Sequence, residues 1–214
     1  MDKLNYFTER IKETETTKEK LFLSAIYLFS TKGYENVGMR ELSNFIGIKA
    51  SSFYNHYPSK EAVFKSIFER FELEMNRVVF TEEEIETIVE KGDVAAFFVE
   101  NMKRFSSVTG NPLFFTMLQI VFMESYKDRK AYEIAIHNLY YIRRGYTEAV
   151  LNGMIENGSI KPVDVELITA EYYYTLKGLL DEDLLQEVWE KEVDYIHERI
   201  KRHMSFFINL LTVG

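Results

Sequence analysis

A short polar segment after residue 50 carries the side chains best suited to chemistry. Within six positions stand two hydroxyls, a phenol, an amide and an imidazole, on Ser51, Ser52, Tyr54, Asn55 and His56. Each can donate or accept a hydrogen bond. Such groups suit phosphate oxygens and the edges of nucleic-acid bases. The segment therefore predicts contact with a nucleic acid, provided that a helix presents it to the outside.

Catalytic chemistry finds less support in the residue types. The chain has no Cys, which removes thiolate nucleophiles, disulfides and thiolate metal sites together. It also lacks the G-x-S-x-G, H-E-x-x-H and glycine-rich phosphate motifs. Its four His residues are scattered, and His197 and His203 do not share the i, i+4 spacing of a helical metal pair. We expect no enzyme, no catalytic residue, no metal and no cofactor.

Charge is distributed unevenly along the chain. The formal net charge is −8, which alone argues against a nucleic-acid partner. Residues 17–60, however, hold six basic residues against three acidic ones, so the acidic surplus lies after residue 60. A basic segment on an acidic body favours a phosphate partner for that segment.

Hydropathy predicts a soluble, cytoplasmic protein without a membrane partner. No run of about 18 apolar residues occurs, so we expect no membrane-spanning helix. The polar N-terminal residues lack the apolar core of a signal peptide.

The elements that position the polar segment are short helices. Thr16 with Glu19 fits a capping box that starts a helix, and Gly33 ends it. A second helix is predicted from about Met39 to Phe45 and a third from about Ala50 to His56. Gly47 stands in the tight turn between them, where a left-handed φ is costly for other residues. This is the pattern of a helix-turn-helix, whose second helix enters the major groove.

The rest of the chain also predicts helices. Ser59 caps the next one, Thr81 and Glu84 form another capping-box candidate, and Asn111-Pro112 starts a further helix. Longer helices are expected from about 128 to 157, 162 to 180 and 187 to 211. Because period-2 alternation is absent, no strand is predicted and the fold class is all-α.

Residues 17–71 resemble the tetracycline-repressor (TetR) family. The resemblance rests on Ala25 with Leu28-Phe29, Gly33-Tyr34, Met39-Arg40-Glu41-Leu42, Gly47-Ile48, Ser52-Phe53-Tyr54 and His56-Tyr57 before Ser59-Lys60-Glu61. It implies a three-helix DNA-binding domain followed by a helical bundle for ligand binding and dimerisation. The implied division is a polar extension (1–15), the helix-turn-helix domain (16–62), a connecting helix (63–78) and the ligand-binding and dimerisation domain (79–214).

The resemblance also implies residue roles. Ser51 and Ser52 fall where the family contacts bases or phosphates, as do Tyr54 and His56, and Asn55 is a further base-reading candidate. Lys60 falls at a phosphate-binding helix start, and Arg40 and Lys49 are candidates for backbone contacts. Other interpretations stay open: Tyr54 could shield the domain core, and Arg40 or Lys60 could be ordinary solvated charges. The family often caps the second helix with Thr or Ser, whereas Val37-Gly38 stands here.

Aromatic residues crowd the part after residue 97. Most should form core, while a subset could line an apolar ligand pocket. The candidates for that subset are Phe98, Phe105, Phe115, Phe122, Tyr126, His137, Tyr141 and Tyr173.

Apolar stripes on the last two helices predict a dimer interface. Its candidate residues are Tyr174, Gly178, Ile196, Ile200, Met204, Phe207 and Leu211. A twofold dimer is what a palindromic operator requires. The sequence thus predicts a homodimeric, ligand-responsive regulator, expected to be a repressor, whose partners are duplex DNA and a small-molecule effector. The alternative is a DNA-bound architectural or cell-division regulator of the same fold without an inducer.

Overall fold

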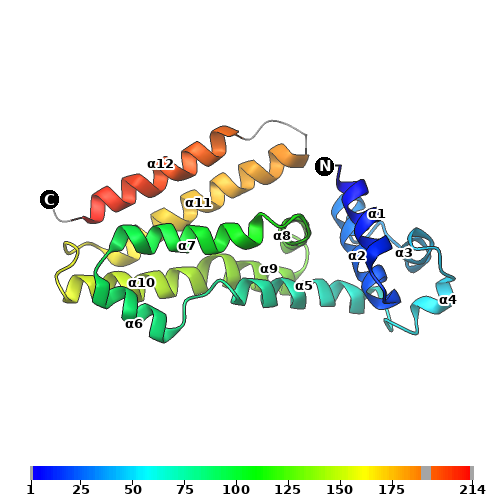
Figure 1. Ribbon diagram of the computed structural model, residues 1–214. Coiled ribbons are helices and arrows are strands. Elements are labelled where there is room, and N and C mark those ends of the chain that lie inside the picture. The colour runs from blue at the N-terminus through cyan, green and yellow to red at the C-terminus, as the bar shows by residue number, and fades with distance from the viewer. Residues whose placement is uncertain (1, 189–193, 213–214) are drawn as a thin grey trace. The chain divides into compact units, whose positions relative to one another are not determined.

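All regular structure described for this chain is helical (Figure 1). The computed structural model describes the backbone of residues 2–188 and 194–212, and the side chains of residues 2–182 and 198–212. Within these ranges the one β-type pairing is an isolated antiparallel bridge between Ile160 and Thr212. The fold class is all-α, as predicted, with an N-terminal helix-turn-helix domain followed by a helical C-terminal part.

Packing divides the chain into two units. The first combines Met1–Arg77 with Val108–Ala135, and the second combines Val78–Ser107 with Ile136–Gly214. The predicted functional division places all of 79–214 in one domain, whereas by packing 108–135 goes with the N-terminal helices. The functional division itself stays a prediction.

The first unit contains the helix-turn-helix. Its helices are α1 (Lys3–Glu13), α2 (Thr17–Lys32), α3 (Met39–Phe45), α4 (Ala50–Phe53), α5 (Lys60–Asn76) and α8 (Pro112–Ser125), and most of α9 (Arg129–Ile136). Helix α2 packs against α1, α3, α5 and α8. It can do so because eight of its side chains are buried, spread around its circumference.

The polar N-terminal extension forms a helix, α1. Helix α1 buries Phe7, whose ring lies 5.9 Å from that of Tyr27 on α2. Lys3 donates a hydrogen bond to the Gln119 side chain on α8 at 2.6 Å. These contacts attach α1 to α2 and α8.

Helix starts follow the predicted caps. The Thr16, Ser59 and Asn111 side chains each accept a hydrogen bond from a backbone N–H of the first turn. Thr81 and Glu84 form a complete capping box at α6. Each of these bonds satisfies a donor that a helix start leaves unpaired.

The second unit is a bundle built around α10. Its helices are α6 (Glu82–Lys91), most of α7 (Val94–Thr109), the π-helical segment η1 (His137–Tyr141), α10 (Ile142–Glu156), α11 (Val165–Val188) and α12 (Asp194–Leu211). Helix α10 packs against α6 and α11, and α11 lies beside α12 (Figure 1). The core gathers apolar side chains from α6, α7, α10, α11 and α12, including Phe97, Leu151, Tyr172 and Phe207.

The helix predicted over 128–157 has a different internal structure. It is α9, η1 and α10 in succession, with a wider π turn at His137–Tyr141. A π turn holds more residues than an α turn, so every residue after it is rotated relative to an uninterrupted α-helix. This rotation decides which side chains of α10 point inward.

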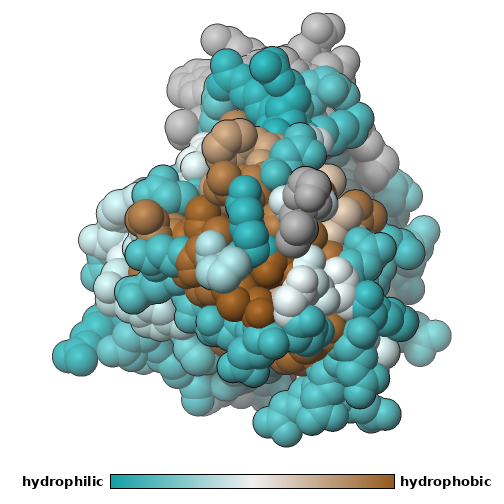
Figure 2. Space-filling model, turned by 90° about the vertical axis from the view of Figure 1, so that its left-hand side faces the viewer, coloured by the Kyte–Doolittle hydropathy of each residue, from teal (hydrophilic) through white to brown (hydrophobic). Residues whose placement is uncertain are grey.

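The core of the second unit reaches the surface at one end. Figure 2 looks at that end, the left of Figure 1, and shows an apolar area ringed by hydrophilic residues. No single helix among the described residues is long and apolar enough to cross a membrane. Helices α7 and α8 reach the length and apolar composition of a membrane span only when they are counted together as a bent pair.

Candidate nucleic-acid interface

The turn between α3 and α4 holds the two helices together. Gly47 adopts φ +73°, the left-handed conformation that the sequence predicted for it. The Ile48 N–H donates to the Ser43 carbonyl at 3.0 Å, and the Gly47 N–H donates to that of Asn44 at 3.1 Å. Leu42 and Phe53 are fully buried beneath this turn. The turn therefore fixes how α4 is presented.

Helix α4 is shorter than predicted. It covers Ala50–Phe53, and residues 54–56 continue as a hydrogen-bonded turn. The His56 and Tyr57 N–H groups both donate to the Phe53 carbonyl, at 2.9 and 3.0 Å. Pro58 disfavours a helical conformation at Tyr57, so no helix continues beyond this turn.

The polar residues of this segment face outward while two aromatic rings face inward. Phe53 and Tyr57 are buried. Lys49, Ser51, Tyr54 and Asn55 are exposed, and Ser52 and His56 are half-buried. Tyr54 keeps 54% of its area exposed, so it does not shield the domain core. The segment thus offers a row of hydrogen-bonding side chains on a fixed scaffold.

Lys60 is held at the start of α5. Its Nζ donates to the Tyr34 carbonyl at 2.9 Å and lies 4.1 Å from the centre of the Tyr34 ring. One of its three donors is therefore used, and the others are left for an anion. Burial, followed by the charges of Glu61 and Glu35, raises the pKa of Tyr34. The Tyr34 carbonyl and ring together hold the Lys60 ammonium in place.

Arg40 is exposed on α3, whose N-terminus lacks a side-chain cap. The missing cap agrees with Gly38 at that position, because glycine has no oxygen to offer. The nearby Lys32 is paired with Glu41 at 2.5 Å, which lowers the net positive charge on that side of α3.

Comparison with known proteins identifies this domain. Residues 21–67 match the profile of the family described as bacterial regulatory proteins, tetR family. The domain formed by residues 21–67 is thus similar to the DNA-binding domain of that family. A relative from Staphylococcus epidermidis, IcaR, is 38% identical over 52 residues, which are 24% of this chain and 28% of that protein. It is described as the negative transcriptional regulator of the biofilm operon icaADBC. The chain thus spans about a quarter of the curated relative it matches.

Solved tetR-type structures share the fold over nearly the whole chain. SmeT, the repressor of the Stenotrophomonas maltophilia multidrug efflux pump SmeDEF, aligns with a TM-score of 0.62 at 14% identity, over 94% of this chain and 92% of that one. A SmeT–triclosan complex aligns with a TM-score of 0.64 at 15% identity, over 94% and 93%. A transcriptional regulator from Rhodococcus aligns with a TM-score of 0.62 at 16% identity, over 93% of this chain and 100% of that one. At these identities the likeness concerns the fold alone.

The predicted ligand-binding residues fall in both packing units. Phe115 and Phe122 lie half-buried in the first unit, and Phe98, Phe105 and Tyr173 lie in the second. Tyr126, the C-cap of α8, is 88% exposed. His137 and Tyr141 are exposed within η1.

The last three residues are therefore not walls of an enclosed pocket in this chain. His137 and Tyr141 lie in the π turn, which the predicted helix over 128–157 did not include. Tyr126 lies beyond the end of its helix, where helical spacing no longer fixes the direction of a side chain.

The dimer prediction is corrected in part as well. Phe207 and Leu211 are buried in the core of their own unit, at 5% and 0% exposure, so neither has area to bury against a second chain. Met204 packs against the same core, and Ile200 is half-buried. The Ile196 side chain lies outside the described residues.

Exposed apolar area on α11 and α12 lies elsewhere. Tyr174 and Gly178 are exposed in the single chain, and their place in an interface stays a prediction. Leu167 is 55% exposed and Phe206 is 60% exposed. The exposed apolar side of α12 is thus displaced by one residue from the predicted stripe, from Phe207 to Phe206.

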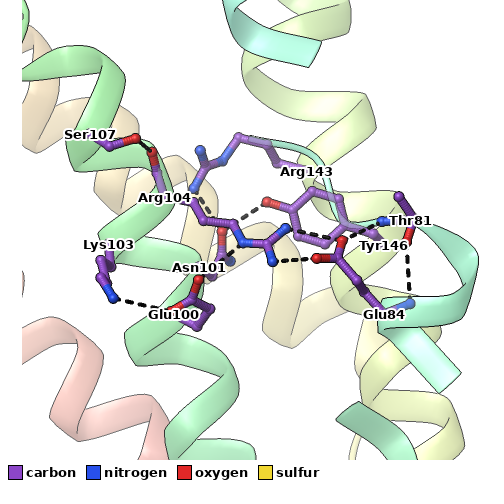
Figure 3. A network of polar contacts seen from close by, with 9 residues as sticks. All are labelled: Thr81, Glu84, Glu100, Asn101, Lys103, Arg104, Ser107, Arg143 and Tyr146. Carbon is purple, nitrogen blue, oxygen red and sulfur yellow. Dashed lines mark hydrogen bonds and ion pairs between the residues drawn. The ribbon is translucent and has the colours of Figure 1, made fainter. Parts of the chain in front are cut away.

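Sequence reasoning missed a buried polar cluster in the second unit (Figure 3). Asn101 on α7 accepts hydrogen bonds from Arg143 at 3.1 Å and Tyr146 at 2.8 Å, and it donates to the Tyr173 hydroxyl at 2.9 Å. Thr147 lies 2.7 Å from that hydroxyl. The available signal was Asn101 itself, a polar residue among Phe97, Phe98 and Phe105.

Proposed function

We propose that this chain is a transcriptional repressor that binds a palindromic operator as a homodimer and releases it when a small molecule binds the C-terminal part. The observation that carries the proposal is the outward row from Lys49 to His56, braced by buried Phe53 and Tyr57, inside a tetR-family domain. IcaR and SmeT, both described as negative regulators, support repression. We assign residues 16–62 to DNA binding, 63–78 to the connection and 79–214 to effector binding and dimerisation. We propose no catalytic activity and a cytoplasmic location.

We assign the outward residues by the chemistry they offer. Ser51, Ser52, Asn55 and His56 carry short donors and acceptors that suit base edges and phosphates. Tyr54, Lys49, Arg40 and Lys60 would contact the phosphate backbone. A phosphate contact adds affinity without sequence preference, whereas a base contact adds preference.

The test of DNA binding starts with operator selection. Oligonucleotides bound by the purified chain would be selected from a random pool, and the selected site used for fluorescence anisotropy across salt concentrations. We expect an inverted repeat whose half-site centres are about 34–36 Å apart or a multiple of that distance. A selected site without twofold symmetry would contradict dimeric recognition.

The contact residues are then tested on that site. Lys49→Ala should weaken binding to selected and random duplexes alike and reduce the log–log salt slope by about 1.8, because each protomer of the dimer loses one phosphate contact worth about 0.9. Asn55→Ala should weaken binding mainly to the selected site, by about 1–3 kcal/mol if the contact is bidentate. Lys130→Ala removes an exposed lysine outside residues 21–67 and should change neither quantity. Equal effects of Lys49→Ala and Lys130→Ala would refute the interface.

The effector half of the proposal requires a separate measurement. A ligand that binds the repressor must lower operator affinity, and typical couplings between two sites are about 1–3 kcal/mol. Unchanged operator affinity with every bound small molecule would instead favour the architectural or cell-division role.

A further inference from the structure

The second unit buries a cation without a counter-ion among the described residues. Arg143 on α10 is 5% exposed. Its Nη2 donates to Asn101 Oδ1, and its guanidinium lies 4.1 Å from the centre of the Phe105 ring. No ion pair within the described part of the chain includes Arg143. Because a guanidinium does not lose its proton in proteins, the charge is buried intact.

The neighbouring Arg104 has its charge balanced by carboxylates, as is usual for a partly buried arginine. Arg104 on α7 keeps 25% of its side chain exposed and pairs with Glu84 at 2.6 Å and Glu100 at 3.1 Å (Figure 3). Arg143 is the more buried of the two and has no carboxylate. Leaving a buried charge unpaired costs several kcal/mol, so an anion that reached Arg143 would relieve a large penalty.

The side chains around Arg143 supply hydrogen bonds but no negative charge. Asn101, Tyr146, Thr147 and Tyr173 form a chain of neutral contacts. Burial raises the pKa of Tyr146 far above its ordinary value, so its hydroxyl stays neutral. The cluster therefore leaves one full positive charge for something else to neutralise.

A second unsatisfied group lies in the same unit. Tyr172 is 1% exposed, and its hydroxyl is buried without a hydrogen-bond partner. Burial raises the pKa of this hydroxyl too, while the nearby Arg143 charge lowers it less. The Tyr172 hydroxyl thus remains a donor that needs an acceptor. The Tyr172 ring lies with its centre 5.1 Å from that of Tyr173, and the Arg143 guanidinium lies 5.5 Å from the centre of the Tyr173 ring. A hydroxyl without a partner and a cation without a counter-ion therefore lie on either side of one residue, and both favour an anionic oxygen.

We propose that Arg143 and Tyr172 recognise the acid group of the effector, and that the effector is an amphipathic monocarboxylate. This inference rests on the effector-controlled function proposed above and adds the chemical class of the ligand. One guanidinium balances one negative charge, so a carboxylate leaves the site neutral, whereas a phosphate dianion leaves an excess charge in the core. The planar donor fork of Arg143 fits both oxygens of a carboxylate.

The surroundings determine the rest of the ligand. The rings of Phe105 and Phe98 lie against Arg143 and Tyr172, the second with its centre 4.8 Å from that of Tyr172. An apolar chain or ring attached to the carboxylate would match these walls. The π segment η1 ends at Tyr141, and Arg143 is the second residue of the α10 helix that follows it directly. π turns of this kind are frequent at functional sites.

The test measures binding to the full chain without DNA. Calorimetric titrations would use hexanoate, octanoate, decanoate and 4-phenylbutyrate, each beside its neutral amide, with inorganic phosphate as a further probe. We expect saturable binding of at least one acid, one molecule per chain, and at least tenfold weaker binding of its amide, because a charged hydrogen-bonded pair is lost.

Two substitutions separate recognition from folding. Arg143→Met should weaken binding of the acid at least tenfold, and Arg104→Met, the matched control with its own carboxylates, should not. Tyr172→Phe should weaken binding a few-fold without lowering the unfolding midpoint, since the hydroxyl makes no hydrogen bond in the unliganded chain. If Arg143→Met fails to fold, Tyr172→Phe still decides the matter.

The inference would be overturned if none of the acids bound saturably, or if inorganic phosphate were the one probe that bound. It would also be overturned if an acid and its amide bound equally well, or if the Tyr172→Phe variant bound the acid as tightly as the wild-type chain does. Failure of the function proposed above would look different. An acid that binds through Arg143 yet leaves operator affinity unchanged would refute the inducer role and keep the site. If only neutral compounds released the operator, the inducer role would be kept and the carboxylate site would be refuted.

Discussion

Glu84 joins three stabilising contacts in one side chain. It closes the capping box of α6 by accepting from the Thr81 N–H at 2.9 Å, and it pairs with both terminal nitrogens of Arg104 at 2.6 and 3.1 Å. Hydrogen bonds from Arg104 and then from the Thr81 backbone lower its pKa from 4.5 to about 2. A carboxyl with a lowered pKa stabilises the folded state above its unfolded pKa and loses that contribution as the pH falls toward the folded value.

We expect acid to cost the wild-type chain stability between about pH 4.5 and 2 partly through Glu84. Glu84→Gln should lower the free energy of unfolding at pH 7 by about 1 kcal/mol, a modest figure because the side chain is 40% exposed. It should also flatten the pH dependence in that window. Urea unfolding at several pH values would measure both effects. Glu83→Gln, an exposed position in the same turn, should leave the slope unchanged.

Single side chains were predictable where local chemistry decides their environment. The outward position of Ser51, Tyr54 and Asn55 follows from the turn and from the apolar Phe53 and Tyr57 that flank them. The burial of Arg143 was not predictable, because it depends on Asn101 and Tyr173, which are distant in sequence.

Helix boundaries were more predictable than helix faces. Caps and glycines at Thr16, Gly33, Ser59 and Thr81 act within a few residues, so the sequence alone indicates them. Faces depend on phase and on what lies opposite. The π turn at His137–Tyr141 has no cap or proline to announce it, and the stripe on α12 could equally face its own core or a partner.

Two glycines of α10 should respond oppositely to alanine. A Cβ on Gly153 would lie 2.8 Å from both Val89 methyl carbons on α6, whereas a Cβ on Gly145 would meet nothing within 4 Å. Gly153→Ala should therefore lower the free energy of unfolding by about 1–3 kcal/mol through overpacking. Gly145→Ala should raise it by about 0.5–1 kcal/mol through helix propensity.

Chemical denaturation of both variants beside wild type gives the comparison. Adding Val89→Ala to Gly153→Ala should recover part of the loss, because it removes both methyl groups. Similar effects of the two glycine variants would show that α6 and α10 are not in close contact.

The quaternary state depends on the apolar residues that the single chain leaves exposed. Leu167, Tyr174 and Phe206 retain 55–60% exposure on the helices that pack together as α11 and α12. We expect Phe206→Glu to convert dimers into monomers in sedimentation experiments and to weaken operator binding, since a monomer reads one half-site. Met123→Glu, an exposed apolar position in the first unit, is the matched control and should stay dimeric. Monomeric wild type at micromolar concentration would contradict the interface.

The short length of α4 has a consequence for how such a regulator evolves. Its surface residues project from a turn that main-chain bonds and two anchored rings already hold in place. Ser51, Tyr54 and Asn55 can therefore be exchanged without rebuilding the scaffold beneath them. If the chain binds DNA as proposed, a duplicated copy of the gene could acquire a new target sequence through a few codon changes while keeping the same fold.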